Sequence, residues 1–352
     1  MTGSPSDDGR APVRRILVLG GFGFLGSHLV EHLLAEPGNQ VHVIDNLSSS
    51  PLPLPDLLAE IGDAERHGGR LTWSVESVDA YCGNGASAWA WDEIYHLASL
   101  VGPAGVLGHA GAIASSVIHD AARVAALALA TGARLLFVST SEVYGGGRDG
   151  LCSEEMPKLV PSGASPRLEY ALGKLAAETS LVNLCRARGL AAVIVRPFNI
   201  SGPRQSGAGG FVLPRFVGQA LAGEDLTVFG DGLQVRAFTN VRDMAAGVVA
   251  ALRRGHPGEI YNLGNPANRC SILDLAEEVR EVTGSGSGIR MVDPRDIYGP
   301  LYAEAHDKFP DPAKAERELG WRPAATRRET VAETVAYMRR LPRPLLHRLR
   351  GF

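Results

Sequence analysis

A glycine-rich turn near the start of the chain restricts the fold more than any other feature of the sequence. Gly20-Gly21-Phe22-Gly23-Phe24-Leu25-Gly26 follows the apolar run Ile16–Leu19 and leads into a helix predicted near 25–36. The first glycine permits a tight turn, Gly23 lets backbone approach a pyrophosphate, and Gly26 lets the helix pack on the strand. Free N–H groups and the positive dipole end at the helix start attract phosphates. The segment therefore predicts a strand–turn–helix unit that binds a dinucleotide.

An acidic residue at the end of the second predicted strand indicates which dinucleotide fits. Asp45 follows Gly26 at about the 20-residue spacing at which a carboxylate accepts hydrogen bonds from the adenosine ribose hydroxyls. A carboxylate there repels a 2′-phosphate, and no arginine follows it in Asp-Asn-Leu-Ser-Ser-Ser. The sequence thus predicts NAD rather than NADP as the cofactor.

Short β-branched runs alternate with helical stretches, which is the pattern of a parallel sheet with crossover helices. The predicted strands are Ile16–Leu19, Val41–Asp45, Leu71–Val75, Glu93–Leu97, Arg134–Ser139, Ala192–Pro197 and Glu259–Leu263. Helices are predicted near 25–36, 112–131, 170–188 and 241–253. The fold class we predict is α/β, a Rossmann-type doubly wound parallel sheet with a smaller C-terminal substrate-binding lobe.

Loops rich in glycine and proline begin near Ser201, where the texture of the sequence changes. Such loops between short helices suit a lobe that closes over a ligand. The predicted organisation is a disordered leader over 1–13, a dinucleotide-binding domain over 14–200 to which 238–265 return, a ligand-binding lobe over 201–237 and 266–340, and a basic tail over 341–352.

Composition and charge are those of an ordinary soluble protein. Hydrophobic residues make up 45%, charged residues 21%, and the net charge is −3 at pH 7, so neither nucleic acid nor an anionic membrane is favoured as a partner. We find no apolar run of membrane-spanning length, and the four cysteines form no metal-binding or disulfide pattern. We therefore expect a cytoplasmic protein without a metal ion.

A tyrosine and a lysine stand four residues apart in the helix predicted near 170–188. Tyr170 and Lys174 then share one helix face, and a nearby cation favours the phenolate, which makes tyrosine a better base. Lysines are scarce: only Lys158, Lys174, Lys308 and Lys314 occur among 35 basic residues, so each is informative. The segment Ser139-Thr140-Ser141-Glu142-Val143-Tyr144-Gly145 follows a predicted strand at the sheet edge where ligands bind. Together these segments are a candidate catalytic site.

Ordered motifs from about residue 14 to 335 carry a family resemblance. They are GGFGFLG, VIDNLSS, YHLAS, STSEVYG, YALGK, RPFNISGPR, TVFGDG, QVRAFTNVRD, YNLGNP and RELGWRP. In this order they resemble the extended short-chain dehydrogenase/reductase family of nucleotide-sugar epimerases, dehydratases and decarboxylases. The resemblance implies a tightly held NAD, a nucleotide sugar (most often a UDP-sugar) as substrate, and a homodimer formed through the helices near 112–131 and 170–188.

The resemblance also implies roles for individual residues. Thr140 should hydrogen-bond the reacting hydroxyl, Tyr170 should be the base and Lys174 should tune it. The residues implied to contact the cofactor are Gly20, Phe22, Gly23, Phe24, Leu25, Gly26, Asp45, Asn46, Leu97, Ala98, Ser99, Tyr170, Lys174 and Pro197. Those implied to contact the nucleotide sugar are Ser141, Asn199, Arg204, Phe211, Val212, Leu213, Val228, Phe229 and Arg236.

The residues after Thr140 bear on the reaction. Family members that are dTDP-glucose 4,6-dehydratases have an Asp-Glu pair there, and Ser141 in place of the Asp disfavours dehydration. The run Thr140-Ser141-Glu142 with Arg236 resembles UDP-glucuronate decarboxylases, in which oxidation at C4 gives a β-keto acid that loses CO2. In that reading Glu142 positions the C5 region, and Arg236 supplies charge or a proton.

Two other readings stay open. A UDP-sugar or UDP-uronate 4-epimerase would let the 4-keto intermediate rotate and take the hydride back on its other face. A non-catalytic NAD-binding scaffold belongs to another class, and the intact Thr140, Tyr170 and Lys174 argue against it. The identities of the sugar and of the base are not fixed by these motifs.

Overall fold

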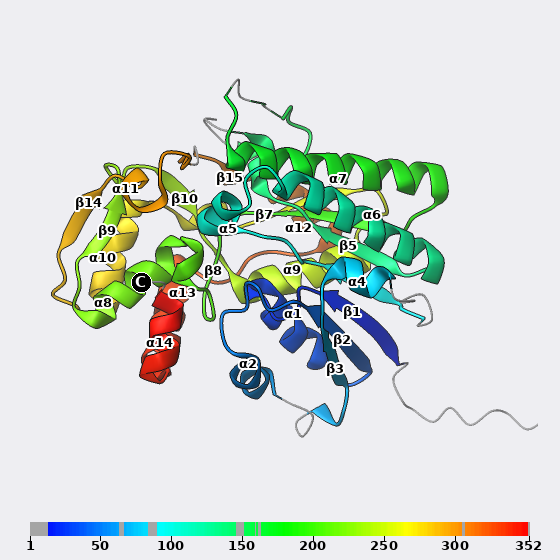
Figure 1. Cartoon of the computed structure of the whole chain (residues 1–352), viewed down its shortest axis with the longest axis horizontal. Coiled ribbons are helices and arrows are strands. Elements are labelled where there is room, and N and C mark those ends of the chain that lie inside the picture. Colours follow the sequence, from blue (N-terminus) through cyan, green and yellow to red (C-terminus); the bar gives the residue numbers. More distant parts are fainter. Residues whose placement is uncertain are drawn as a thin grey trace, which may run out of the picture.

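A seven-stranded parallel sheet is the centre of this computed structural model (Figure 1). The structure describes residues 13–62, 67–83, 90–145, 151–158, 160, 163–304 and 307–350, so the expected leader lies outside it except for Val13. The sheet order is β12-β7-β5-β4-β1-β2-β3. The strands are β1 (Arg14–Leu19), β2 (Asn39–Asp45), β3 (Leu71–Val75), β4 (Glu93–His96), β5 (Arg134–Val138), β7 (Ala192–Pro197) and β12 (Ile260–Leu263).

The sheet confirms the predicted fold class. Each strand begins and ends within two residues of its predicted bounds, and every neighbouring pair is parallel. The chain progresses from β1 to β2 and β3 in one direction and from β4 to β5 and β7 in the other. Ligands of open α/β sheets bind at the carboxyl ends of the strands beside such a reversal, here between β1 and β4.

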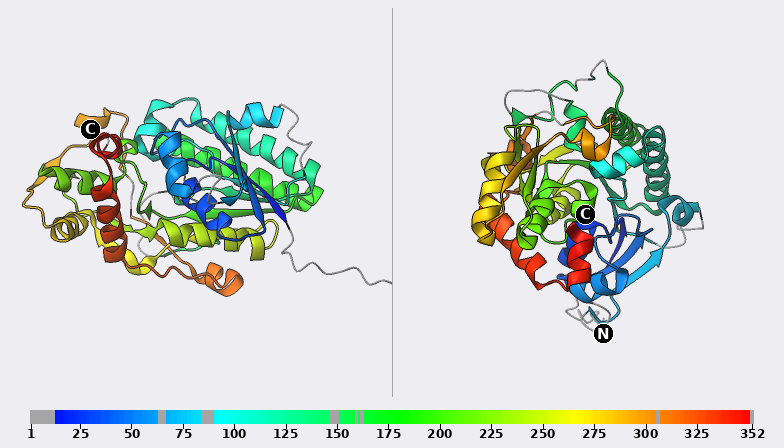
Figure 2. Two further views of the ribbon diagram at one scale, coloured as in Figure 1. Left: turned by 90° about the horizontal axis from the view of Figure 1, so that it is seen from below. Right: turned by 60° about the vertical axis from the view of Figure 1, so that its left-hand side comes forward.

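Helices cover both faces of the sheet, as Figure 2 shows, because alternate side chains of a buried strand point to opposite faces. In β1, Ile16 and Val18 belong to the core cluster beneath α1 (Phe24–Leu34) and α9 (Val241–Arg254). Leu17 and Leu19 belong to the other cluster. The helices that contribute to this second cluster are α4 (Val78–Gly83), α5 (Gly102–Gly108), α6 (Ile113–Thr131) and α7 (Pro166–Arg188).

The long helix α7 begins four residues earlier than predicted. Ser165 caps it by accepting a hydrogen bond from the backbone N–H of Leu168 at 3.1 Å. Pro166 occupies the first turn, where its missing N–H costs nothing. This early start brings Arg167 onto the same helix as Tyr170.

A smaller lobe follows β7 and lies to the left in Figure 1. Its longer helices are α8 (Val212–Ala222), α10 (Ile272–Thr283), α13 (Arg327–Arg340) and α14 (Arg343–Arg350). Its strands pair as β9 (Leu226–Phe229) with β14 (Ile289–Val292) and β10 (Val235–Ala237) with β13 (Arg269–Ser271). The shorter elements of the chain, in both parts of the molecule, are α2 (Leu54–Ile61), α11 (Arg295–Tyr298), α12 (Ala313–Leu319), β6 (Leu151–Cys152), β8 (Ile200–Ser201), β11 (Thr239–Asn240) and β15 (Phe309–Pro310). Between parts of the lobe, α9 and β12 return to the large sheet.

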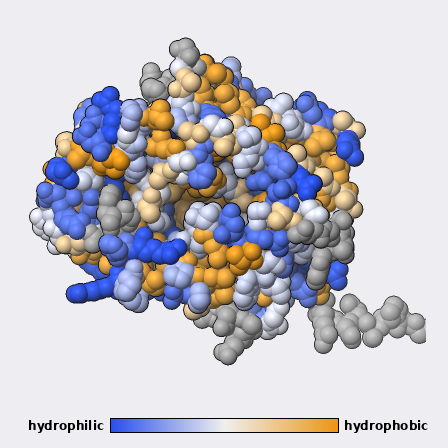
Figure 3. Space-filling model, in the orientation of Figure 1, coloured by the Kyte–Doolittle hydropathy of each residue, from blue (hydrophilic) through white to orange (hydrophobic). Residues whose placement is uncertain are grey.

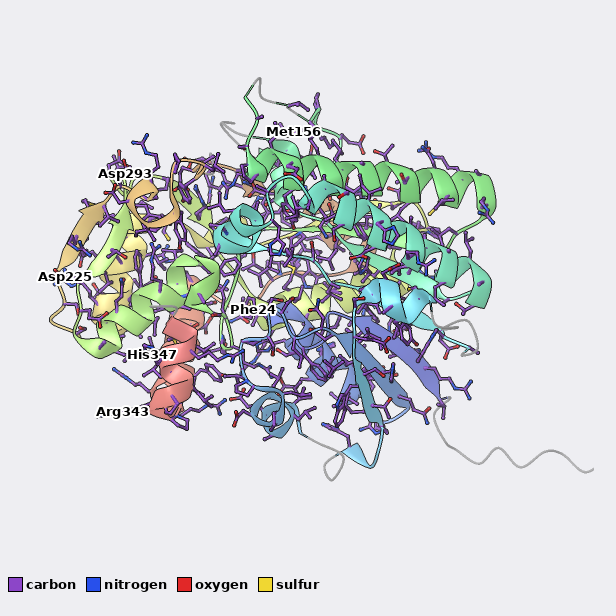
Figure 4. The ribbon with its side chains drawn as sticks, viewed as in Figure 1. Phe24, Met156, Asp225, Asp293, Arg343 and His347 are labelled. Atoms are coloured by element: carbon purple, nitrogen blue, oxygen red, sulfur yellow. The ribbon has the colours of Figure 1, made fainter. Side chains whose placement is uncertain are left out.

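The basic tail forms a packed helix over its described part. In α14, Leu349 is fully buried in the main core cluster, and Leu345 and Leu346 pack against that cluster. Arg348 donates a hydrogen bond from Nη2 to the carbonyl oxygen of Ser50, 3.2 Å away, in the loop after β2. Figure 4 labels Arg343 and His347 on this helix. The helix thus connects the lobe to the edge of the sheet domain.

One helix in the described ranges, α6, is long and apolar enough to cross a membrane by length and composition. This corrects the expectation that no such run occurs. In the fold, α6 packs along α7 and against β4 and β5, as core helices of α/β proteins do. Length and composition alone are therefore weak evidence for a membrane span.

Candidate active site

A cavity of about 1240 Å³ lies between the sheet and the lobe. Figure 3 shows the molecule hollowed on the face seen in Figure 1. The turns that follow β1, β4 and β5 form its floor, and α8 and β9 contribute to the opposite wall. Of the site residues expected from the sequence, the lining includes Gly20, Gly23, Phe24, Leu25, Gly26, Asp45, Asn46, Leu97, Ala98, Ser99, Thr140, Ser141, Glu142, Tyr170, Lys174, Pro197, Asn199, Phe211, Val212, Phe229 and Arg236.

Four expected residues have other surroundings. Phe22, Leu213 and Val228 are buried in the main core cluster and support the cavity wall from behind. Arg204 is a correction to the expected phosphate or sugar contact: its Nη2 donates to Glu31 Oε2 at 2.5 Å and lies 2.7 Å from His28 Nδ1. Because its guanidinium is directed toward α1, Arg204 joins the loop after β8 to that helix.

The glycine-rich turn fits a pyrophosphate. Gly20 has a φ of +83°, and a Cβ there would lie 2.6 Å from the backbone N of Ala98. A Cβ on Gly26 would collide with the carbonyl oxygen of Gly20, so both glycines are required by packing. A Cβ on Gly23 would meet only that oxygen, at 3.4 Å, which leaves its cavity side open. Figure 4 marks Phe24 where α1 begins, and the first N–H groups of this helix are available to phosphate.

Asp45 lies at the end of β2, where the adenosine ribose of a dinucleotide is expected. Its Oδ2 accepts a hydrogen bond from the N–H of Phe22 at 2.9 Å, and its Oδ1 accepts one from Leu47 at 2.7 Å. Burial raises the pKa of Asp45, and these backbone donors act in the opposite direction. Each carboxylate oxygen has a further lone pair, and the residue lines the cavity. The side chain is therefore fixed in place and still able to accept from ribose hydroxyls.

Asp45→Ala is expected to weaken NAD binding by about 10- to 100-fold and to narrow its advantage over NADP, because charged hydrogen bonds contribute about 1.5–3 kcal/mol. Titration calorimetry with both dinucleotides measures this. Asp45→Asn keeps an acceptor for Phe22 or Leu47 and serves as the control for loop structure. Equal or tighter binding of NADP by the unmutated protein would contradict the assignment.

Tyr170, Thr140 and Ser99 meet at the centre of the cavity. The side chains of Thr140 and Ser99 are near enough to the Tyr170 hydroxyl to lower its pKa. Burial raises the pKa of Tyr170, and the charge of Glu142 raises it further. The phenol is therefore protonated until positive charge is added nearby. Thr140 is itself held by its position after β5, where its Oγ1 accepts from the N–H of Glu142 at 3.2 Å.

Lys174 lies one helical turn after Tyr170. Its Nζ donates to the carbonyl oxygen of Val138 at 2.8 Å and is 5.9 Å from the centre of the Tyr170 ring. Burial lowers the pKa of Lys174 to about 7, although Glu178 raises it. One further turn along α7, Glu178 forms a buried ion pair with Arg196, 2.5 Å between Oε2 and Nη2. The face of α7 toward the sheet is thus a polar stripe that fixes the lysine.

Glu142 is paired with two cations that the motifs did not single out. Its Oε1 accepts from Lys308 Nζ at 2.9 Å, and its Oε2 is 3.7 Å from Arg167 Nε. Burial raises the pKa of Glu142, but the charges of Lys308, Arg167 and Arg236 lower it to about 2. Arg236 instead contacts Glu304 at 2.8 Å and Asp307 at 3.2 Å. These cations therefore favour the ionised form of Glu142 at neutral pH.

Lys308 and Arg167 were missed by the motif analysis. Lys308 is 4% exposed, which is rare for a lysine without a partner charge. The scarcity of lysine in this chain was the available signal. Burial lowers the pKa of Lys308, and Glu142 raises it. Arg167 lines the cavity beside Glu142, whereas Lys308 contacts the site through that carboxylate.

Known proteins resemble this chain in sequence and in fold. The family model described as the NAD dependent epimerase/dehydratase family matches residues 16–264. UDP-glucuronic acid decarboxylase 1 of Xenopus tropicalis is 34% identical over 332 residues, 93% of this chain and 72% of that protein. UDP-N-acetyl-alpha-D-glucosaminuronate decarboxylase of Bacillus cytotoxicus is 30% identical over 333 residues, 93% of this chain and 98% of that protein.

Solved structures agree with the sequence relatives. UDP-glucuronic acid 4-epimerase of Bacillus cereus, in complex with UDP-glucuronic acid and NAD, aligns with a TM-score of 0.78 at 26% identity, covering 92% of this chain and 98% of that one. dTDP-glucose 4,6-dehydratase of Bacillus anthracis, in complex with NAD, has a TM-score of 0.79 at 23% identity, covers 95% and 100% of the two chains, and supports the fold alone. With the matched family model covering most of the chain, this protein belongs to the NAD dependent epimerase/dehydratase family.

Proposed function

We propose that this protein is an NAD-dependent decarboxylase of UDP-glucuronate. The observation that carries the proposal is the ionised Glu142, held by Lys308 and Arg167 on the cavity side of Tyr170. A uronate 4-epimerase must retain the C5 carboxylate, whereas a decarboxylase is helped by a negative charge beside it, which Glu142 supplies. The similarity to UDP-glucuronic acid decarboxylases over 93% of the chain supports the same choice.

The hydroxyl groups of Thr140 and Tyr170 bind and transfer the proton at C4. NAD, when bound, would supply the hydride chemistry at C4. Thr140 orients the C4 hydroxyl and Tyr170 accepts its proton, while Lys174 places positive charge beside the Tyr170 ring, 5.9 Å from its centre. The resulting 4-keto uronate is a β-keto acid, whose C5–carboxylate bond breaks to release CO2 and leave an enolate.

Glu142, Lys308 and Arg167, here called the Glu142 cluster, govern the step at C5. The negative charge of Glu142 disfavours a second carboxylate beside it and so favours loss of CO2. Lys308 lies behind Glu142 and outside the cavity lining, so it supplies the proton that C5 regains through that carboxylate. Arg167 lies on the cavity side of the same carboxylate and balances the charge of the enolate.

Purified protein incubated with UDP-glucuronate tests the proposal. Release of CO2 together with UDP-xylose, followed by mass spectrometry of the nucleotide sugars, is the expected result. UDP-galacturonate without CO2 would favour the 4-epimerase, a reading supported by the structural similarity to UDP-glucuronic acid 4-epimerase. No product and no reduced nicotinamide would favour the non-catalytic scaffold.

We also propose a homodimer formed through α6 and α7. These two helices pack side by side on one face of the sheet, and Ile118 and Leu172 are each 40% exposed. Only 39% of the apolar stretch of α6 is buried within the chain. A second copy of the chain would cover the rest in a four-helix bundle. Sedimentation is expected to give twice 37.3 kDa, with Ile118→Glu and Leu172→Glu together giving the monomer. A monomer of the unmutated protein at micromolar concentration would contradict this proposal.

A further inference from the structure

A buried arginine at the lobe end of the cavity has hydrogen-bonding capacity that the described chain does not use. Arg215, on α8, is 2% exposed and lines the cavity. Its Nη2 donates to the carbonyl oxygen of Thr227 at 3.0 Å. Its Nε and Nη1 are buried and have no hydrogen-bond partner of normal geometry among the described residues, and the Tyr298 hydroxyl is only a weak side-chain partner of the guanidinium. Burying such donors without acceptors is costly, so a ligand is the natural partner.

The surroundings of Arg215 are aromatic. Its guanidinium carbon lies 3.8 Å from the centre of the Phe229 ring. Phe229 forms T-shaped ring pairs with Tyr298 and Tyr302, with ring centres 5.9 and 6.1 Å apart. Tyr298 and Tyr302 are stacked on each other at 5.5 Å. Phe211, Phe229 and Tyr302 line the cavity together with the arginine. A flat heterocycle suits this wall better than a phosphate does, because aromatic faces bind planar rings and do not compensate an anion.

The charge of Arg215 is also weakly balanced. Burial lowers its pKa, and Tyr298, Tyr302 and Glu304 act in the opposite direction. None of the ion pairs among the described residues includes Arg215. Arginine has donors and no acceptor, so only acceptor atoms of a ligand can complete its hydrogen bonds.

We propose that Arg215 selects the base of the nucleotide sugar by donating hydrogen bonds to ring carbonyl oxygens. This rests on the proposed function, because it assumes that a nucleotide sugar fills the cavity. Uracil and thymine present two carbonyl oxygens, whereas cytosine presents an amino group at C4, which would oppose the donors of the arginine. Leaving a buried donor unpaired is how polar sites reject a wrong ligand.

Calorimetric titration of the NAD-containing protein with UDP and with CDP tests the proposal without requiring catalysis. The unmutated protein should bind UDP at least about tenfold more tightly than CDP. Arg215→Met keeps the length of the side chain and removes its donors, so it should abolish most of this preference. Arg215→Gln carries both a donor and an acceptor and should bind the two nucleotides about equally. Arg290→Met, on exposed β14, is the matched control and should keep the preference.

The outcomes separate the arginine from the proposed function. Equal weakening of UDP and CDP in Arg215→Met would mean that the arginine holds phosphate and would overturn the proposal. An unmutated protein with no preference, or an unchanged preference in both Arg215 variants, would overturn it as well. Binding of neither nucleotide would instead refute the nucleotide-sugar function. If Arg215→Met fails to fold, the UDP and CDP affinities of Arg215→Gln give the same comparison, and a thermal melt checks that this variant is folded.

Discussion

Tyr170→Phe is expected to abolish reduction of the bound NAD by any nucleotide sugar. The substitution removes the hydroxyl that is proposed to take the C4 proton, while the ring keeps its packing in the second core cluster. A positioned general base contributes about 10²–10⁴-fold to rate, so the loss should be at least of this size. Single-turnover absorbance in the reduced-nicotinamide band after mixing with UDP-glucuronate measures it.

A second tyrosine provides the control for this loss. Tyr261 on β12 is buried, and its hydroxyl lies 3.0 Å from Glu318 Oε2, away from the cavity lining. Tyr261→Phe removes the same atom from a buried ring and should leave the reduction rate within a few-fold of normal. Reduction by Tyr170→Phe at a comparable rate would mean that another group takes the proton, and Tyr170 would then be a positioning residue.

The large sheet was predictable because its evidence is local. Each strand is a short run such as Ala192–Pro197, buried on both faces and bounded by turns, so hydrophobicity alone marks it. The tail shows the opposite case. Pro342, Pro344 and several arginines obscure the three leucines of α14, and only packing against the lobe makes that segment a helix.

That Thr140, Tyr170 and Lys174 come together was predictable for a similar reason, whereas the contact of Lys308 with Glu142 was not. Tyr170 and Lys174 are joined by helix geometry, and Thr140 by the end of a strand. Glu142 and Lys308 are 166 residues apart, and only the loop before β15 brings them together. Arg204 was assigned to the ligand from its neighbours in sequence, but a φ of +66° belongs to a backbone whose direction the sequence does not reveal. Sequence motifs therefore placed correctly the residues whose side-chain direction follows from a helix or a strand, and failed for those whose direction is set by a loop.

The two steps of the reaction should separate in Glu142→Gln. This variant is expected to form enzyme-bound reduced nicotinamide from UDP-glucuronate at a rate close to normal, because Thr140, Tyr170 and Lys174 are intact. CO2 release should fall by about 10²-fold or more, since the amide neither repels the C5 carboxylate nor holds the Lys308 ammonium. Absorbance of the reduced nicotinamide, recorded beside CO2 evolution, distinguishes the two effects.

Lys308→Met tests whether the lysine acts through Glu142. It removes the strongest of the charges that lower the pKa of Glu142, so this pKa should rise from about 2 while CO2 release falls as in Glu142→Gln. The matched control is Lys314→Met, which loses an ion pair with Glu259 at 2.6 Å, a hydrogen bond to the carbonyl oxygen of Ile260 at 3.0 Å and a contact with the Tyr261 ring, all outside the cavity lining. Normal CO2 release by both site variants would remove the Glu142 cluster from the mechanism. An epimerase needs no proton at C5. If the unmutated protein interconverts the C4 epimers and releases no CO2, the cavity is the site of a 4-epimerase.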